Sequence, residues 1–164
     1  MNELTLGEMM ARKDALENEA AKLLGHMLFE FSRLDMNLGL CLVWVDGGTK
    51  LESLTKTVSD QCMSAKLVEL SKHVDAKLPT GSNRHKAYQA WLARTNKVRQ
   101  QRNELVHGRW GIDPYNNTVI NVLGLPTLEA QRSVEYTVDE LAAINDELRS
   151  LQRELSKLRE QWPL

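Results

Sequence analysis

Apolar residues spaced three or four positions apart dominate the N-terminal third of the chain. This spacing lines one face of an α-helix, because the helix turns once every 3.6 residues. We predict a helix from about Leu4 to Val45, ended by Asp46-Gly47-Gly48, since glycine readily adopts the left-handed conformation that follows many helices. The residues of the stripe are Leu16, Ala20, Leu23, Met27, Phe31, Leu34, Leu38, Cys41 and Val45.

Three more helical segments are predicted before the middle of the chain gives way to strands. Thr49-x-x-Glu52 resembles a capping box that starts a short helix, and Ser59-Asp60 starts another that ends near Leu78. The Pro79–Asn83 segment is a loop with Asn83 as an N-cap. From there a helix runs to His107 and stops at Gly108, a residue type favoured just past a helix end.

The pattern after Gly108 changes to short β-favouring runs. Residues 110–112 and 118–122 read as two strands of a hairpin, and residues 133–137 as a third short strand. Thr137-x-x-Glu140 is a capping box that opens a last, leucine-rich helix. We therefore predict a single, mainly α domain over residues 1–164: a bundle of four to five helices with a small β-hairpin inserted before the C-terminal helix.

Composition excludes several classes of protein. The formal net charge is −1, so no global basic field indicates a protein that coats long duplexes. Cys41 and Cys62 lie in helical, apolar segments without a second Cys or a His at ligand spacing, which predicts core thiols and neither metal nor cofactor. The N-terminus lacks a signal-peptide pattern, and the apolar run Leu38–Val45 is too short to span a bilayer, so we expect a cytoplasmic protein.

The helix before Gly108 carries the polar residues of greatest interest. Its inward stripe is Tyr88, Trp91, Thr95, Val98, Arg102 and Leu105, so Arg102 occupies a position where the spacing favours an apolar residue. A buried arginine needs an anionic partner. That partner is either a carboxylate of a neighbouring helix, which makes Arg102 structural, or a bound ligand; alternatively, the side chain extends outward to solvent.

Asn103 and His107 are four residues apart and share one helix face, which Arg99 extends by a further turn. An amide at this spacing can orient an imidazole, although a histidine at a helix end also serves simply as a cap. Arg102 and His107 are five residues apart, about 140° around a regular helix. They converge through the long arginine side chain, a frayed last turn, or two-fold packing of this helix against a second copy.

The segment Arg102-Asn103-Glu104-Leu105-Val106-His107 resembles the Arg-polar-x3-to-5-His motif of the HEPN superfamily, with Asn in its favoured place after the Arg. The resemblance covers the first helix through His107, together with the last helix. HEPN proteins are four- or five-helix bundles that dimerise around this motif, and many are metal-independent endoribonucleases of toxin, antiviral-defence and RNA-processing systems. The resemblance therefore implies RNA as substrate, a homodimer through the motif helix, and an antitoxin or another protein as partner.

The resemblance also implies roles for individual residues. His107 acts as general acid or base at the RNA 2'-hydroxyl and the leaving 5'-oxygen. Arg102 holds the scissile phosphate, and Asn103 orients His107 or contacts the phosphate. Two further arginines are candidate substrate-binding residues from their positions in the sequence. Arg99 extends the polar stripe of the motif helix, and Arg109 either adds a phosphate contact or faces solvent at the edge of the hairpin.

One position departs from a subgroup of the family. HEPN toxins that are silenced by nucleotide modification carry a Tyr two residues after the His, where this chain has Arg109, so that mode of control is not implied.

Two other interpretations remain open. A HEPN-like module without catalytic activity could keep the same residues for structure or for docking a nucleotide or protein partner. A helix-turn-helix DNA-binding protein would need a short turn between helices and a basic recognition helix, and the sequence does not show the turn.

Overall fold

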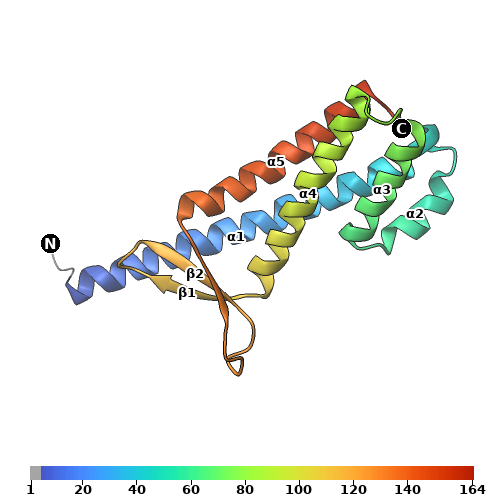
Figure 1. The fold of residues 1–164 in the computed structure, drawn as a ribbon. Coiled ribbons are helices and arrows are strands. Elements are labelled where there is room, and N and C mark those ends of the chain that lie inside the picture. Colours follow the sequence, from blue (N-terminus) through green and yellow to red (C-terminus); the bar gives the residue numbers. More distant parts are fainter. Residues whose placement is uncertain (1–4) are drawn as a thin grey trace. The chain divides into compact units, whose positions relative to one another are not determined.

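A computed structural model describes residues 5–164, which form five α-helices and one three-stranded antiparallel sheet inserted before the last helix (Figure 1). The predicted fold class, a mainly helical bundle with a small β insertion, is confirmed. The elements are α1 (Leu6–Val43), a 3-10 turn η1 (Val45–Gly48), α2 (Leu51–Ser59), α3 (Met63–Lys77), α4 (Asn83–His107), β1 (Arg109–Asp113), β2 (Thr118–Leu123), β3 (Arg132–Tyr136) and α5 (Val138–Gln161).

The two ends of α1 have clear local causes. At its start the Thr5 backbone N–H and hydroxyl both donate to Glu8 Oε2, at 2.8 and 2.7 Å, which is a capping box that we did not predict although Thr5-x-x-Glu8 is legible in the sequence. We predicted that this helix starts at Leu4, which lies outside the described residues. The same holds for residues 1–4, which we searched for a signal-peptide pattern. The predicted stop is confirmed, because Asp46, Gly47 and Gly48 have φ values of 58°, 67° and 77°.

The residues of the chain group into two compact units, and each is described by itself. The first comprises Met1–Leu28 and Gln101–Asp146, and the second comprises Phe29–Gln100 and Glu147–Leu164. Each of the helices α1, α4 and α5 contributes residues to both units.

The sheet of the first unit has the strand order β1-β2-β3, with Trp110 opposite Asn121 and Asn121 opposite Val134. The hairpin and the third strand that the sequence predicts are therefore both present. The capping box after β3 is also confirmed, since the Thr137 N–H donates to Glu140 Oε2 at 2.8 Å and the Glu140 N–H donates to Thr137 Oγ1 at 3.2 Å.

The second unit has a core of large apolar side chains, in which Leu34, Leu38, Tyr88 and Trp91 lie as the helical spacing predicts. Trp91 is completely buried, and its indole Nε1 donates to the Leu151 carbonyl of α5 at 2.9 Å. The Tyr88 hydroxyl donates to the Trp162 carbonyl at 2.9 Å, which ties α4 to the end of α5. Burial raises the pKa of Tyr88, so this hydroxyl stays a donor at any physiological pH. Fully buried leucines and a valine complete this core: Leu34, Leu38, Leu70, Leu148, Leu151 and Val74.

Three predicted helix starts are wrong by a few residues. The helix α2 begins at Leu51 after Lys50, with no side-chain cap, so Thr49 and Glu52 do not form the predicted capping box. The helix α3 begins at Met63 rather than after Ser59-Asp60. At the start of α4 the His85 N–H donates to Ser82 Oγ at 3.2 Å, so Ser82 fills the capping role that we assigned to Asn83.

Cys62 does not belong to the core. It is exposed, whereas Cys41 is buried, and burial raises the pKa of the Cys41 thiol to about 11. Cys62 precedes α3, where its thiol lies 3.1 Å from the Ser64 hydroxyl, because the helix that should have buried it starts one residue later.

Glu30 is a buried carboxylate in the second unit. It is 8% exposed and accepts hydrogen bonds from Arg33 at 3.0 Å, Arg149 at 3.3 Å and Gln152 at 2.9 Å. Burial by itself raises the pKa of Glu30, but the bonds from Gln152 and Arg149, together with the positive charge of Arg33, lower it below its ordinary value.

We expect this pKa shift to appear as a pH-dependent stability. Because the folded-state pKa is lowered, the contribution of Glu30 is fully present above its unfolded pKa, about 4.3, and is lost as the pH falls through the lower folded value. Urea unfolding of wild type and Glu30→Gln between pH 3 and pH 7 measures the effect. The variant should be less stable at pH 7 and approach wild type at pH 3, and a difference that is constant with pH would contradict the assignment.

No helix of residues 5–164 combines the length and the apolar character that crossing a membrane requires.

Candidate functional site

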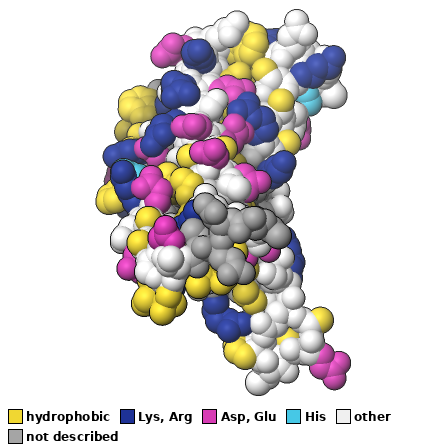
Figure 2. All heavy atoms as spheres, turned by 90° about the vertical axis from the view of Figure 1, so that its left-hand side faces the viewer, with side chains coloured by type: hydrophobic (Ala, Val, Ile, Leu, Met, Phe, Trp, Pro, Cys, Tyr) yellow, Lys and Arg dark blue, Asp and Glu magenta, His cyan; other side chains and the backbone are white. Residues whose placement is uncertain are grey.

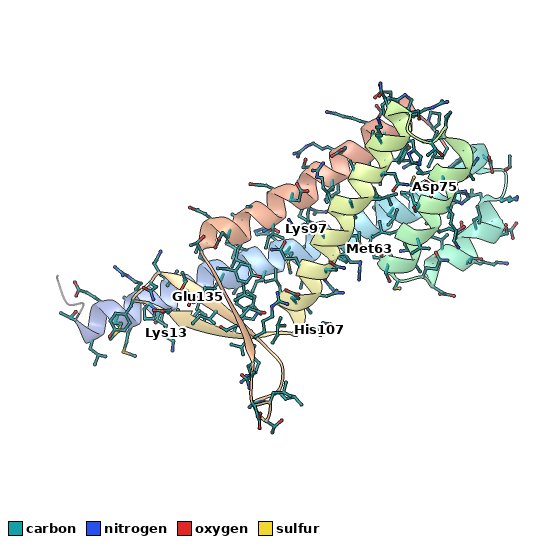
Figure 3. All side chains as sticks on the ribbon, in the orientation of Figure 1. Lys13, Met63, Asp75, Lys97, His107 and Glu135 are labelled. Atoms are coloured by element: carbon teal, nitrogen blue, oxygen red, sulfur yellow. The ribbon has the colours of Figure 1, made fainter. Side chains whose placement is uncertain are left out.

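The predicted motif occupies the last turns of α4, in the first unit. Leu105 is 1% exposed and anchors the turn in the core, whereas Val106 and His107 are exposed. Figure 3 marks His107 at the very end of α4, where the chain turns into β1. The imidazole thus has access to solvent, while the backbone that carries it is fixed by its neighbours.

Arg102 and Asn103 lie together one turn before His107. Both are half-buried, and Arg102 Nη1 donates to Asn103 Oδ1 at 3.2 Å. The Arg102 Nε atom is shielded from solvent. The amide oxygen of Asn103 is thus directed at the guanidinium, and its N–H2 group is the end that can donate to a ligand or to His107.

The acidic residue inside the motif faces the sheet. Both oxygens of Glu104 accept from Arg132 of β3, each at 3.0 Å, in a bidentate pair. Gln101, on the same side of α4, hydrogen-bonds Tyr136, whose pKa is raised mainly by burial. The Glu104 carboxylate is therefore paired with the positive charge of Arg132 on β3.

Trp110 of β1 closes the end of α4. Its Nε1 donates to the Leu105 carbonyl at 3.0 Å, and its ring packs against that of Tyr136, with centroids 6.1 Å apart. The last carbonyls of a helix have no partner within the helix, so this indole supplies one. Trp110 thus packs the hairpin onto the motif helix, with its ring against Tyr136 and its N–H on the end of α4.

Gly108 is required here for a reason different from the one we predicted. It does not have a positive φ, so it is not the left-handed cap that its position suggested. Instead, a Cβ at Gly108 would lie 2.3 Å from both side-chain heteroatoms of Asn121, a residue of β2 that is 1% exposed. Asn121 therefore packs directly on the backbone that follows His107, and sequence reasoning missed it because nothing in an alternating strand marks one position as facing a helix end.

We expect Gly108→Ala to destabilise the protein by about 1–3 kcal/mol, because overpacking a filled site forces side chains or backbone to shift. Urea unfolding measures the change. Gly111→Ala in β1 is the matched control, since its Cβ would come no closer than 4.0 Å to Ile120. Equal stability of the two variants would contradict the close approach of Asn121.

The two arginines predicted to flank the motif have other partners. Arg109, on β1, donates to Gln131 Oε1 at 2.7 Å and is exposed. Arg99 donates through Nε to Asn96 Oδ1 at 3.0 Å and belongs to the second unit. The structure therefore brings together Arg102 and Asn103 by a direct bond, and it places Arg99 and Arg109 on hydrogen bonds of their own.

Residues 5–164 hold no group of three or more His, Cys, Asp or Glu side chains that could bind a metal ion. The chemistry available at the end of α4 is that of an exposed imidazole, a guanidinium and an amide.

No family model, curated protein or solved structure matches this chain.

Proposed function

We propose that the protein is a metal-independent endoribonuclease of HEPN type, acting as a homodimer in which two copies of the α4 motif form one site. The observation that carries the proposal is the end of α4, where His107 is exposed and, five residues earlier, the Arg102 guanidinium donates to Asn103 Oδ1 at 3.2 Å. The bidentate Glu104–Arg132 pair supports it further, because it keeps the carboxylate of the motif from repelling a phosphate.

In this proposal the RNA 2'-oxygen attacks the adjacent phosphorus while the bond from phosphorus to the 5'-oxygen breaks. One His107 takes the proton of the 2'-hydroxyl, and the second copy's His107 protonates the leaving 5'-oxygen, since a positioned imidazole can serve as general base or general acid. Arg102 stabilises the charge that develops on the phosphate oxygens, since a planar fork of donors suits phosphate. The products are a 2',3'-cyclic phosphate and a 5'-hydroxyl.

The decisive experiment is incubation of a mixed RNA pool with wild type and with His107→Ala in EDTA, followed by mapping of the product ends. Cleavage by wild type alone, leaving cyclic or 3'-phosphates and 5'-hydroxyls, supports the proposal. Cleavage by both proteins, or 5'-phosphate products, contradicts it. No cleavage by either favours the alternative of a HEPN-like module without catalytic activity, in which the motif docks a nucleotide or a protein such as an antitoxin.

A further inference from the structure

The charges of the chain are divided unevenly between its two compact units. The first unit, which carries Arg102 and His107, has 6 basic residues (Lys and Arg) and 12 acidic ones (Asp and Glu). The second unit has 15 basic residues and 10 acidic ones. The net charge of −1 therefore conceals an acidic unit and a basic one. A polyanionic substrate would find most of its favourable electrostatic contacts on the second unit.

The part of α4 that belongs to the second unit, residues 83–100, contains no acidic residue. Of its five cations, Arg94 is held by two carboxylates of α5, Glu147 and Glu154. Within residues 5–164 no salt bridge engages the other four, which are Arg84, Lys86, Lys97 and Arg99. On the surface in Figure 2, by comparison, cationic and acidic side chains lie next to one another over much of the face shown.

The exposed side of this segment is a continuous row, which we name the α4 basic face. On the opposite side of the helix, Tyr88, Trp91 and Thr95 are completely buried. Figure 3 labels Lys97, which lies part-way along α4, and Arg99 lies at the edge of the row through its bond to Asn96. The α4 basic face consists of the exposed residues Lys86, Ala90, Ala93, Asn96, Lys97 and Gln100.

We propose that the α4 basic face binds the phosphate backbone of single-stranded RNA, an inference that rests on the proposed function. Lysine ammonium groups neutralise phosphates, and exposed amides donate to phosphate oxygens and ribose hydroxyls. Lys86 and Lys97 are separated by roughly 16 Å along the helix axis, given a rise of 1.5 Å per residue. These donors lie along one side of a single helix, which suits one strand, whereas duplex RNA is read by shape across its grooves.

The test compares two double variants of equal charge in the 164-residue chain that also carries His107→Ala, so that binding is measured without cleavage. One is Lys86→Gln with Lys97→Gln. The control is Lys50→Gln with Lys56→Gln, which removes two exposed lysines of the same unit at α2. The probe is a fluorescently labelled 20-nucleotide polyuridine, and its affinity is measured from 50 to 200 mM salt.

Loss of two phosphate contacts should reduce the slope of log affinity against log salt by about 1.4 for Lys86→Gln with Lys97→Gln, and leave the control slope at the parent value. Equal slopes for both variants, or no binding of the parent protein to the probe, would overturn the inference. The two proposals can fail separately. If the slope changes only for Lys86→Gln with Lys97→Gln but wild type does not cleave RNA, the α4 basic face is supported and the ribonuclease proposal is contradicted. If wild type cleaves RNA but both double variants have equal slopes, the ribonuclease proposal is supported and the α4 basic face is contradicted.

Discussion

Replacing His107 with alanine is expected to lower the single-turnover rate of RNA cleavage by about 100- to 10,000-fold, the usual contribution of a positioned general acid or base. The side chain is exposed at the end of α4, so its removal leaves no cavity in the core, and the melting temperature should stay near that of wild type. A large loss of rate at constant stability separates a catalytic imidazole from a histidine that only caps the helix. The rate is measured on a defined RNA in EDTA.

Two further variants make this result specific. His26→Ala removes another exposed histidine of the first unit and should leave the rate unchanged. Arg102→Ala should lower the rate by about 100- to 1,000-fold, because it removes a donor to the charge that develops in the transition state. Cleavage that survives both His107→Ala and Arg102→Ala would exclude the end of α4 as the active site.

The helices and strands could be predicted because one-sided burial leaves a local, periodic record in the sequence. The apolar stripe of α4 includes Arg102, and the structure places that side chain half-buried among buried neighbours, as the spacing indicates. Capping motifs were less reliable. Thr137 and Glu140 form a capping box, but the same residue pattern at Thr49 and Glu52 does not, since α2 begins only at Leu51.

The surroundings of the candidate site could not be predicted in the same way, because they depend on contacts between distant segments. Gly108 is recognisable as a helix end, but its actual constraint is Asn121 in the middle strand, and that contact exists only once the sheet packs on α4. The partner of Glu104 was equally hidden, since Arg132 reaches it from β3. Trp44 is a second example, because its large apolar side chain favours burial, yet it follows the last residue of α1 and is 50% exposed.

Trp91→Ala is expected to cost about 3–5 kcal/mol in the free energy of unfolding, the largest loss of stability that we predict. The indole is completely buried in the second unit, so truncation leaves a cavity as well as forfeiting its transfer free energy. The same change removes the hydrogen bond from Nε1 to the Leu151 carbonyl, which joins α4 to α5. Urea unfolding followed by circular dichroism measures the loss.

Two other variants divide this cost between packing and hydrogen bonding. Trp91→Phe keeps an aromatic ring but loses the Nε1 donor, and it should cost clearly less than Trp91→Ala, with about 0.5–1.5 kcal/mol of the loss due to the bond. Trp44→Ala deletes an indole of equal size that is half exposed, and its effect should be much smaller. Equal losses for Trp91→Ala and Trp44→Ala would contradict the assignment of Trp91 to the core. The helix α4 carries both the α4 basic face and the His107 motif. A large loss of stability for Trp91→Ala, but not for Trp44→Ala, would therefore show that the packing of Trp91 holds in place the helix on which both surfaces lie.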